Sequence, residues 1–289
     1  MIAKAPLRVS FSGGGTDISP YAEQYGGCVL SMAIKKFTYA KYPARSETLL
    51  EKTISNFFAV EGISITSEAP PMSGLGGSAS CFAAGIKAIK PNLKRRRVAE
   101  LAYHLERDVM GVAGGKQDQY MVSFGGLNYL EFTDKVRIKQ LKCPEGLEDL
   151  LILVYLGRRK NAGQDIIKDQ MGKLNYKAFQ QQKDIAREMV NCLENDRVKD
   201  FGRLLDKAWH SKMEFSPLVA NDELKDFYYN CIKWGAIGGK LTGAGGGGYM
   251  LLMEHPDKIG QLRLKLWAAR IDFEKVQYEG RGVRCVKSR

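Results

Sequence analysis

The stretch of sequence that decides the fold reads Pro71-Met72-Ser73-Gly74-Leu75-Gly76-Gly77-Ser78-Ala79-Ser80. Before it, residues 63–67 alternate apolar and polar side chains, which predicts a strand that ends at the prolines. After it, apolar side chains recur at helical spacing, which predicts that the loop ends at a helix N-terminus. Free N–H groups and the positive end of the helix dipole then face glycines that lack a Cβ, so we expect this loop to bind phosphate.

Other interpretations of this loop stay open on the residues alone. It is not a Walker A loop, because no lysine precedes Ser78. It fits the loose dinucleotide pattern G-x-G-x-x-A, but two prolines separate it from the strand, whereas a dinucleotide loop follows its strand directly. A purely structural glycine turn is a further alternative. Ser78 is either a helix N-cap or a ligand of Mg²⁺ beside a bound triphosphate.

The charge of the chain favours anionic partners. Its 289 residues are enough for two domains, and 44 Lys and Arg against 32 Asp and Glu give a formal net charge of +12. The densest basic run, residues 94–97, opens a helix with an apolar stripe, and no recognised nucleic-acid module accompanies it. We therefore expect phosphorylated small molecules rather than nucleic acid as partners.

The apolar segments and the cysteines bear on location. The longest apolar run, residues 150–156, is too short to span a bilayer, and the N-terminus lacks the apolar core of a signal peptide. Six cysteines without a C-x-x-C pair favour free thiols in a reducing compartment over disulfides or zinc. We expect a cytoplasmic protein with no membrane partner, and its oligomeric state stays open.

The N-terminal segment combines a cation with a carboxylate. Residues 3–12 read as a strand that carries Arg8, and the glycine run Gly13-Gly14-Gly15-Thr16-Asp17 follows. This arrangement suits the floor of a cleft, and the alternative is a tight turn with Asp17 as a helix N-cap. Residues 27–40 are predicted to form two strands of an antiparallel sheet, and residues 47–58 a helix.

Two further carboxylates are candidates for chemistry. Glu106 lies at the border of the apolar stripe of a helix over residues 95–110, where a metal ion is one partner for a partly buried carboxylate. Asp118 follows a glycine pair and is a candidate general base, with Lys116 as a nearby cation that lowers its pKa. The alternative for Asp118 is an N-cap in a turn. A hairpin is predicted over residues 127–132 and 136–141.

The pattern changes near Cys143, where we place a boundary between domains 1–143 and 144–289. A strand over 150–156 leads into the basic triplet of residues 158–160, which is either functional or an exposed charged turn. A third glycine loop, residues 238–248, is followed by a strand rather than a helix, which excludes a dinucleotide-binding unit. The remaining predictions are helices over 162–172, 175–195, 197–213, 222–235 and 257–269 and a strand over 274–279.

The three glycine loops, in this order and with two carboxylates between them, resemble the motifs of the GHMP small-molecule kinases. The resemblance spans residues 5–250. It implies an α/β (α+β) fold of two domains, with mixed or antiparallel sheets packed by helices and an active site in the cleft between the domains.

The resemblance also implies roles for individual residues. Residues 73–79 (Ser73, Gly74, Leu75, Gly76, Gly77, Ser78 and Ala79) match the ATP phosphate loop, with one residue fewer after its proline. Ser78 and Glu106 match the ligands of Mg²⁺, Asp118 the catalytic aspartate, and Arg8 and Asp17 the conserved pair of the N-terminal motif. Gly77 replaces the first serine of the family's pair, which puts one hydroxyl contact to the phosphates in question.

Details of the first and third motifs resemble the D-glycero-D-manno-heptose 7-phosphate kinase branch of the family. That branch uses ATP to phosphorylate the anomeric hydroxyl, giving the 1,7-bisphosphate. The alternative is a kinase of an unphosphorylated sugar such as L-fucose or mannose. A sugar phosphate needs cations to offset repulsion from ATP, and Lys116 and Lys240 are the preferred candidates. The full set of expected substrate contacts is Gly14, Gly15, Thr16, Asp17, Lys116, Lys240, Gly243, Gly245 and Gly246.

Overall fold

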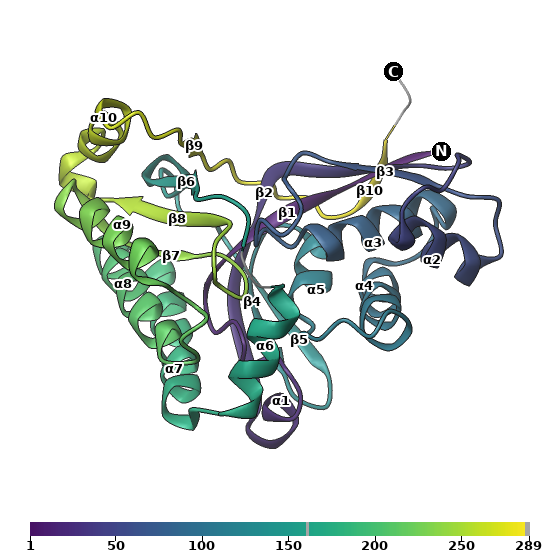
Figure 1. The fold of residues 1–289 in the computed structure, drawn as a ribbon, viewed down its shortest axis with the longest axis horizontal. Coiled ribbons are helices and arrows are strands. Elements are labelled where there is room, and N and C mark those ends of the chain that lie inside the picture. Colours follow the sequence, from purple (N-terminus) through teal and green to yellow (C-terminus); the bar gives the residue numbers. More distant parts are fainter. Residues whose placement is uncertain (160–161, 287–289) are drawn as a thin grey trace.

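The computed structural model describes residues 1–159 and 162–286, which form two antiparallel sheets covered by helices (Figure 1). The strand order of the first sheet is β10-β1-β2-β4-β5, and β3 pairs with β2 beside this path. Its strands are β1 (Ile2–Ser12), β2 (Gly27–Lys41), β3 (Ser64–Ser67), β4 (Leu127–Phe132), β5 (Val136–Leu141) and β10 (Arg284–Val286). The predicted class of helices with antiparallel sheets is confirmed.

Strand β2 corrects one prediction, because residues 27–41 form one strand of 15 residues rather than two. No glycine, proline or asparagine interrupts residues 28–41, so nothing in the sequence forces a turn. The strand instead changes partners along its length, pairing with β4 over its first part and with β3 over its last part. Its pairing with β1 shifts register between Pro6 and Leu7, which accommodates the length of the ribbon.

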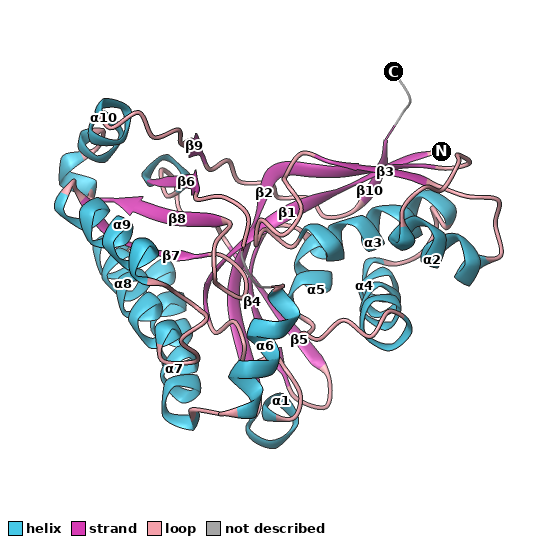
Figure 2. Cartoon of the chain, viewed as in Figure 1, coloured by secondary structure: helices cyan, strands magenta, loops and turns pink. Residues whose placement is uncertain are grey.

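Helices α2 to α5 of the first half gather on one side of the molecule, whereas α1 lies apart from them near α6 (Figure 2). The helices of this half have the following bounds. They are α1 (Tyr21–Tyr25), α2 (Leu49–Phe58), α3 (Gly77–Ile89), α4 (Arg95–His104), the π-helix η1 (Leu105–Val109) and α5 (Gln117–Phe124). Thr48 and Glu51 cap α2 reciprocally, which explains why it begins where it does. The basic run of residues 94–97 opens α4, where the Arg96 guanidinium donates to the Val136 carbonyl. Helix α3 packs on β1 and β2.

The second sheet has the order β7-β8-β6-β9, and all of its pairs are antiparallel. Its strands are β6 (Leu151–Tyr155), β7 (Ala236–Leu241), β8 (Tyr249–Glu254) and β9 (Glu274–Lys275). Its helices are α6 (Gly163–Gly172), α7 (Tyr176–Glu194), α8 (Val198–Met213), α9 (Asp222–Lys233) and α10 (Gln261–Ala268). Short 3₁₀ turns, η2 (Glu148–Leu150) and η3 (Pro256–Lys258), complete it.

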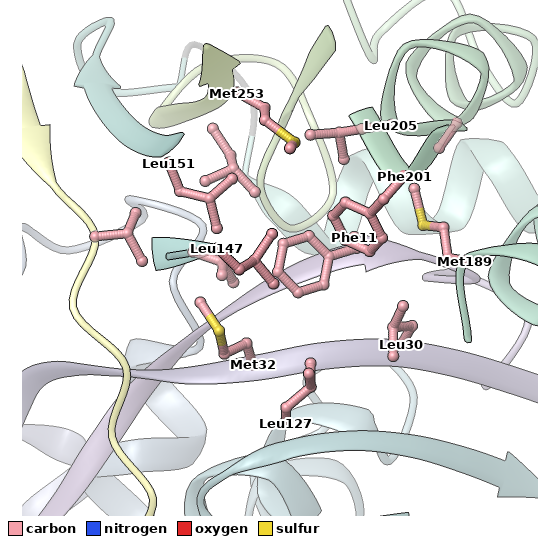
Figure 3. Packing of buried hydrophobic residues seen from close by; sticks show 14 of the residues in the cluster. Phe11, Leu30, Met32, Leu127, Leu147, Leu151, Met189, Phe201, Leu205 and Met253 are labelled. Atoms are coloured by element: carbon pink, nitrogen blue, oxygen red, sulfur yellow. The ribbon is translucent and has the colours of Figure 1, made fainter. Parts of the chain in front are cut away.

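One apolar core joins the two halves. Figure 3 shows Phe11 and Leu30 of the first sheet packed against Leu151, Phe201 and Met253 of the second half. The rings of Phe11 and Phe201 meet edge to face, with centroids 5.0 Å apart. Helix α7 also contacts both β1 and β2. Because a large apolar interface resists relative motion, the halves are held in a fixed orientation.

The chain returns to the first sheet after β9. Strand β10 pairs with β1, and the backbone of Glu279 donates to the carbonyl of Ala33 in β2. Residues 279–286 therefore lie with the first sheet, although the predicted boundary places them in domain 144–289. We keep a division near residue 143 as a proposal and assign this returning segment to the first domain.

Candidate active site

The phosphate loop has the geometry that its flanking sequence predicts. Strand β3 ends at Ser67 and α3 begins at Gly77, with Gly76 as N-cap in the left-handed region at φ 74°. No side chain caps α3, so the N–H groups of its first turn are free to meet an anion. The Arg8 backbone N–H donates to the Leu75 carbonyl at 3.0 Å, which fixes the loop to β1. Ser78 is exposed on the first turn.

Arg8 connects this loop to Asp118. Its Nε and Nη2 donate to the two carboxylate oxygens of Asp118 at 2.7 and 2.6 Å, and its Nη1 donates to the Gly74 carbonyl at 2.5 Å. Arg8 is 3% exposed and Asp118 23% exposed. The bidentate pair therefore presents a partly open carboxylate beside the phosphate loop.

Lys116 does not take the role expected of it. Its amine lies over the ring of Tyr103, 5.3 Å from the centroid, and it does not line the pocket described below. The cation that pairs with Asp118 is Arg8. Lys116 is the residue directly before α5.

Asp17 is buried at the turn of the first glycine motif. Its carboxylate accepts from the Gly15 N–H at 3.2 Å, from the Gln117 N–H at 3.0 Å and from the Gln117 side-chain amide at 3.0 Å. A Cβ at Gly115 would lie 2.0 Å from Asp17 Oδ2, so only glycine permits this approach. Burial raises the pKa of Asp17, and the N–H bonds from Gln117 and Gly15 oppose that rise.

Thr16 holds the turn rather than facing the pocket. Its fully buried hydroxyl donates to the Gly13 carbonyl at 2.7 Å and accepts from the Cys28 N–H at 3.0 Å. These bonds occupy the hydroxyl, and Thr16 is not among the residues that line the pocket.

A pocket between the two halves brings the motifs together. From the predicted set it contains Arg8, Gly14, Gly15, Asp17, Asp118 and Gly243. It adds residues that sequence reasoning missed, namely Ser10, Ile18, Arg107, Gly114, Gly115, Gln117, Ile167, Gln170, Lys212 and Ala244. The predicted cleft thus has walls from both halves of the chain.

Besides Thr16 and Lys116, three more predicted substrate residues lie outside the pocket lining, namely Lys240, Gly245 and Gly246. Lys240 is buried and its amine donates to the Ser10 carbonyl at 3.0 Å. Burial lowers the pKa of Lys240 to about 7, and the charges of Lys212 and Arg8 add to this effect. Gly245 faces Val219, and a Cβ at Gly246 would lie 2.7 Å from Ile166 Cδ1, so close packing within the second half explains both glycines.

The third glycine loop and Arg159 lie against the phosphate loop. A Cβ at Gly243 would lie 3.0 Å from the Gly74 Cα and 2.8 Å from Arg159 Nη2. Arg159 is 8% exposed, its Nη2 donates to the Thr242 carbonyl at 3.2 Å, and its Nε has no partner among the described residues. Burial lowers the pKa of Arg159 to about 10. Arg158 is exposed, and Lys160 lies outside the described residues.

Lys212, on α8, is a pocket residue that no motif marked. It is 4% exposed, and its amine lies 3.4 Å from the Gly14 carbonyl and 3.5 Å from Gln170 Oε1. Burial lowers the pKa of Lys212 to about 8, while the charge of Asp17 opposes the change. Helical spacing could have indicated that Lys212 is buried, because the buried Ala208 and Trp209 stand four and three residues before it on the same face of α8.

Glu106 lies on the π-helix next to the start of α3. It is buried, and its Oε2 accepts from the Gln119 side-chain amide at 2.6 Å, while Oε1 lies 3.7 Å from Arg107 Nη1. Burial raises the pKa of Cys81 in α3 to about 11, and the charge of Glu106 contributes. The π-helix that carries Glu106 contacts α3. Within residues 1–159 and 162–286 no group of three His, Cys, Asp or Glu side chains is suited to hold a metal ion.

No helix of the described residues combines the length and apolar character needed to cross a membrane.

Comparisons with known proteins agree with this geometry. Residues 40–126 match the family model of the GHMP kinase N-terminal domain, and residues 189–270 that of the C-terminal domain. The chain is 31% identical to D-glycero-alpha-D-manno-heptose 7-phosphate kinase of Campylobacter jejuni, across 88% of this chain and 89% of that protein. It is 25% identical to a bifunctional fucokinase/GDP-fucose pyrophosphorylase of Arabidopsis thaliana, across 90% of this chain but only 30% of the longer plant protein.

Solved structures give the same result. A D-glycero-D-manno-heptose 1-phosphate kinase of Bacteroides thetaiotaomicron superimposes with a TM-score of 0.76 at 25% identity, covering 99% of both chains. Phosphomevalonate kinase of Streptococcus pneumoniae also reaches 0.76 at 15% identity, over 95% of this chain and 99% of that one, which shows a shared fold. The chain belongs to the GHMP kinases and is an ATP-dependent phosphotransferase.

Proposed function

We propose that this protein transfers the γ-phosphate of ATP to the anomeric hydroxyl of D-glycero-D-manno-heptose 7-phosphate, giving the 1,7-bisphosphate. The observation that carries the proposal is the position of Arg8. One guanidinium holds the Asp118 carboxylate through two bonds and the Gly74 carbonyl of the phosphate loop through a third. A carboxylate for the acceptor hydroxyl and a site for the ATP phosphates are thereby fixed next to each other.

The reaction that we propose follows from this arrangement. Asp118 orients the sugar hydroxyl and accepts its proton as the hydroxyl oxygen attacks the γ-phosphorus, and the bond from that phosphorus to the bridging oxygen breaks, so that ADP leaves. Arg8 offsets the negative charge that would otherwise accumulate between the carboxylate and the phosphate, and the N-terminus of α3 binds the phosphate oxygens. Positioning and charge stabilisation supply most of the rate enhancement in phosphoryl transfer, and these residues supply both.

Ser78 and Glu106 are the residues that would hold Mg²⁺. One hydroxyl and one carboxylate fit an ion that usually keeps several waters and takes substrate phosphates as ligands, instead of a cage made only of protein. Ser78 lies exposed on the first turn of α3, and the π-helix that carries Glu106 contacts α3, which supports this assignment. When bound, Mg²⁺ neutralises phosphate charge and orients the leaving group.

Two observations support a phosphorylated sugar as substrate. The relative with 31% identity is a heptose 7-phosphate kinase by name. In addition, among the described residues that line the pocket, three cations (Arg8, Arg107 and Lys212) outnumber two carboxylates (Asp17 and Asp118). The similarity to a fucokinase favours, as the second candidate, a kinase of an unphosphorylated sugar such as L-fucose or mannose.

A substrate panel tests the proposal. Purified protein with ATP and Mg²⁺ is given heptose 7-phosphate, free heptose, mannose and L-fucose, and kcat/KM is measured for each. We expect the highest kcat/KM for heptose 7-phosphate, and ³¹P NMR should show the new phosphate on C1. Equal kcat/KM for phosphorylated and free sugars would contradict the proposal and favour the second candidate.

A further inference from the structure

The buried ammonium group of Lys212 is poorly satisfied by the protein itself. Its contacts, 3.4 Å to the Gly14 carbonyl and 3.5 Å to Gln170 Oε1, are both longer than ordinary N–H···O bonds. On another side it lies over the ring of Phe215, 4.5 Å from the centroid. An ammonium carries three N–H donors, and burying a charge is costly unless good acceptors surround it. Lys212 thus lines the pocket as a charged donor without a close acceptor.

Acceptors from the first half line the same pocket. Asp17 and Lys212 meet at the first glycine turn, where Asp17 accepts from the Gly15 N–H at 3.2 Å and a Cβ at Gly15 would lie 3.6 Å from the Lys212 amine. Gln117 donates its amide N–H to Asp17, and this bond leaves Gln117 Oε1 buried and without a partner among the described residues. Charged donor, charged acceptor and free carbonyl oxygen therefore line one end of the pocket.

The support of Lys212 comes from a second element of the same half. Gln170, on α6, is fully buried and donates its side-chain N–H to the Ala244 carbonyl of the third glycine loop at 3.2 Å. Its Oε1 is thereby turned toward Lys212. Helices α6 and α8 and the third glycine loop thus fix the position of this amine from the second half, opposite Asp17 of the first half.

We propose that Lys212 and Asp17 together bind one hydroxyl group of the sugar. Lys212 donates a hydrogen bond to the hydroxyl oxygen, and the Asp17 carboxylate accepts a hydrogen bond from the same hydroxyl. Gln117 Oε1 accepts a hydrogen bond from a neighbouring hydroxyl. This inference rests on the proposed function, because it takes the ligand of the pocket to be a sugar, and it assigns a substrate-binding role to a residue of the second half. Lys212 is a specificity-determining residue in this scheme.

The chemistry of the subsite favours a hydroxyl over the phosphate of the substrate. A hydroxyl donates and accepts at once, which matches a cation and a carboxylate on opposite sides. A phosphate dianion in the same place would face the Asp17 carboxylate at short range in a poorly solvated pocket, where like charges repel strongly. The phosphate of a sugar phosphate therefore binds away from this end of the pocket.

A set of monodeoxy sugars tests the inference against Lys212→Met. Methionine keeps the length of the chain and removes the charge and the donors. The substrate is whichever sugar the wild-type enzyme uses best, and kcat/KM is measured for that sugar and for each monodeoxy analogue, with both enzymes. Lys183→Met is the matched control, because Lys183 is 5% exposed on α7, donates to the Tyr25 carbonyl at 2.7 Å and does not line the pocket.

We expect Lys212→Met to lower kcat/KM for the sugar roughly 10- to 100-fold, the range for losing a hydrogen bond to a charged group, with the KM for ATP little changed. With the wild-type enzyme, one deoxy analogue should have a kcat/KM lower than that of the parent sugar by a similar factor. With Lys212→Met, the kcat/KM for that analogue should be close to the kcat/KM for the parent sugar, whereas every other analogue should show the same fall in kcat/KM with both enzymes. Lys212→Arg should recover part of the loss. Lys183→Met should keep the wild-type pattern.

Two results would overturn the inference. One is an equal penalty for every deoxy analogue in wild type and Lys212→Met, which would show that Lys212 contacts no hydroxyl. The other is selective loss of the substrate phosphate contact, seen as equal use of phosphorylated and free sugar by Lys212→Met alone. If the wild-type enzyme instead prefers an unphosphorylated sugar, the proposed substrate fails, and the deoxy series on that sugar still decides the role of Lys212.

Discussion

The two walls of the pocket differ in how completely their polar groups are paired. On the wall from the first half, Asp118 receives two bonds from Arg8, and Asp17 accepts three N–H groups. On the wall from the second half, Lys212 has two long contacts and the Nε of Arg159 has no partner among the described residues. The two carboxylates of the first wall are held in place by protein donors, although Gln117 Oε1 beside them has no partner among the described residues, whereas the cations of the second half lack close acceptors.

This difference predicts that mutations on the two walls affect different kinetic constants. Changes on the first wall should mainly lower kcat, because they disturb groups already arranged for the reaction. Changes on the second wall should mainly raise KM, because they remove donors that only the ligand uses. Each of the following experiments is expected to support or contradict this division, and the expected effects decrease from the first to the last.

Asp118→Asn should lower kcat by roughly 10²–10⁴-fold, the usual contribution of general-base catalysis, while ATP binding persists. Asparagine keeps the shape but cannot take a proton and pairs poorly with Arg8. Steady-state kinetics and calorimetric titration with ATP measure the two effects separately. Asp108→Asn is the control, because Asp108 is exposed and, within the described part of the chain, its ion pair is with His104. A kcat close to that of wild type in Asp118→Asn would mean that another group accepts the proton.

Glu106→Gln and Ser78→Ala should raise the Mg²⁺ concentration needed for half-maximal turnover. Loss of a supporting hydrogen bond alone costs roughly 10–100-fold in metal affinity, and loss of a ligand should cost at least that much. Turnover measured against free Mg²⁺ tests this, with Ser80→Ala as control, because the buried Ser80 hydroxyl is already donated to the Ala5 carbonyl. Mg²⁺ curves that coincide with the wild-type curve in both variants would remove these residues as ligands.

Arg159→Met should raise the KM for ATP by roughly tenfold and change kcat little. Arg159 lies between Gly74 and Gly243, where its guanidinium can reach phosphate, and a hydrogen bond to a charged group contributes ~1.5 kcal/mol or more. The neighbouring Arg158→Met removes the same charge from an exposed position and should leave KM unchanged. A large fall in kcat with unchanged KM would instead mean that Arg159 acts in the reaction step, as proposed for the residues of the first wall.

Lys240→Met should reduce the pH dependence of stability. The folded-state pKa of Lys240 is lowered to about 7 from 10.5, so between these values the unfolded chain binds more protons and the free energy of unfolding rises with pH. One proton contributes at most ~1.4 kcal/mol per pH unit. Urea unfolding between pH 7 and 9 should show a shallower rise for Lys240→Met than for wild type or for the exposed Lys233→Met. Identical slopes in all three proteins would show that Lys240 stays charged when folded.

Much of the first wall could be predicted because its residues lie in short motifs next to glycine loops. Glycine runs mark places where the backbone must approach another group, as Gly115 approaches Asp17. The order of the three loops then predicted the family, and the matches to the N-terminal and C-terminal GHMP kinase domain models confirm it. The roles of Asp118, Arg8, Ser78 and Glu106 stay predictions for the experiments above.

Apart from Gly243, the second wall could not be predicted, for physical reasons that differ between residues. Lys212 and Gln170 lie on ordinary amphipathic helices, where spacing shows that a residue faces inward but not what it faces. Lys240 lies in β7, which was missed because Gly238 and Gly239 disfavour a strand. A Cβ at Gly238 would lie 2.2 Å from the Gly202 carbonyl, so close packing of α8 on β7 requires the glycine.

The return of residues 284–286 to β1 has a consequence for synthesis on the ribosome. β1 is made first and β10 last among the described strands, so one edge of β1 waits for its partner while the entire second half emerges. At the usual 5–20 residues per second this takes on the order of tens of seconds. Unpaired edges invite contacts between chains, so nascent copies on neighbouring ribosomes should be most prone to association before β10 leaves the exit tunnel.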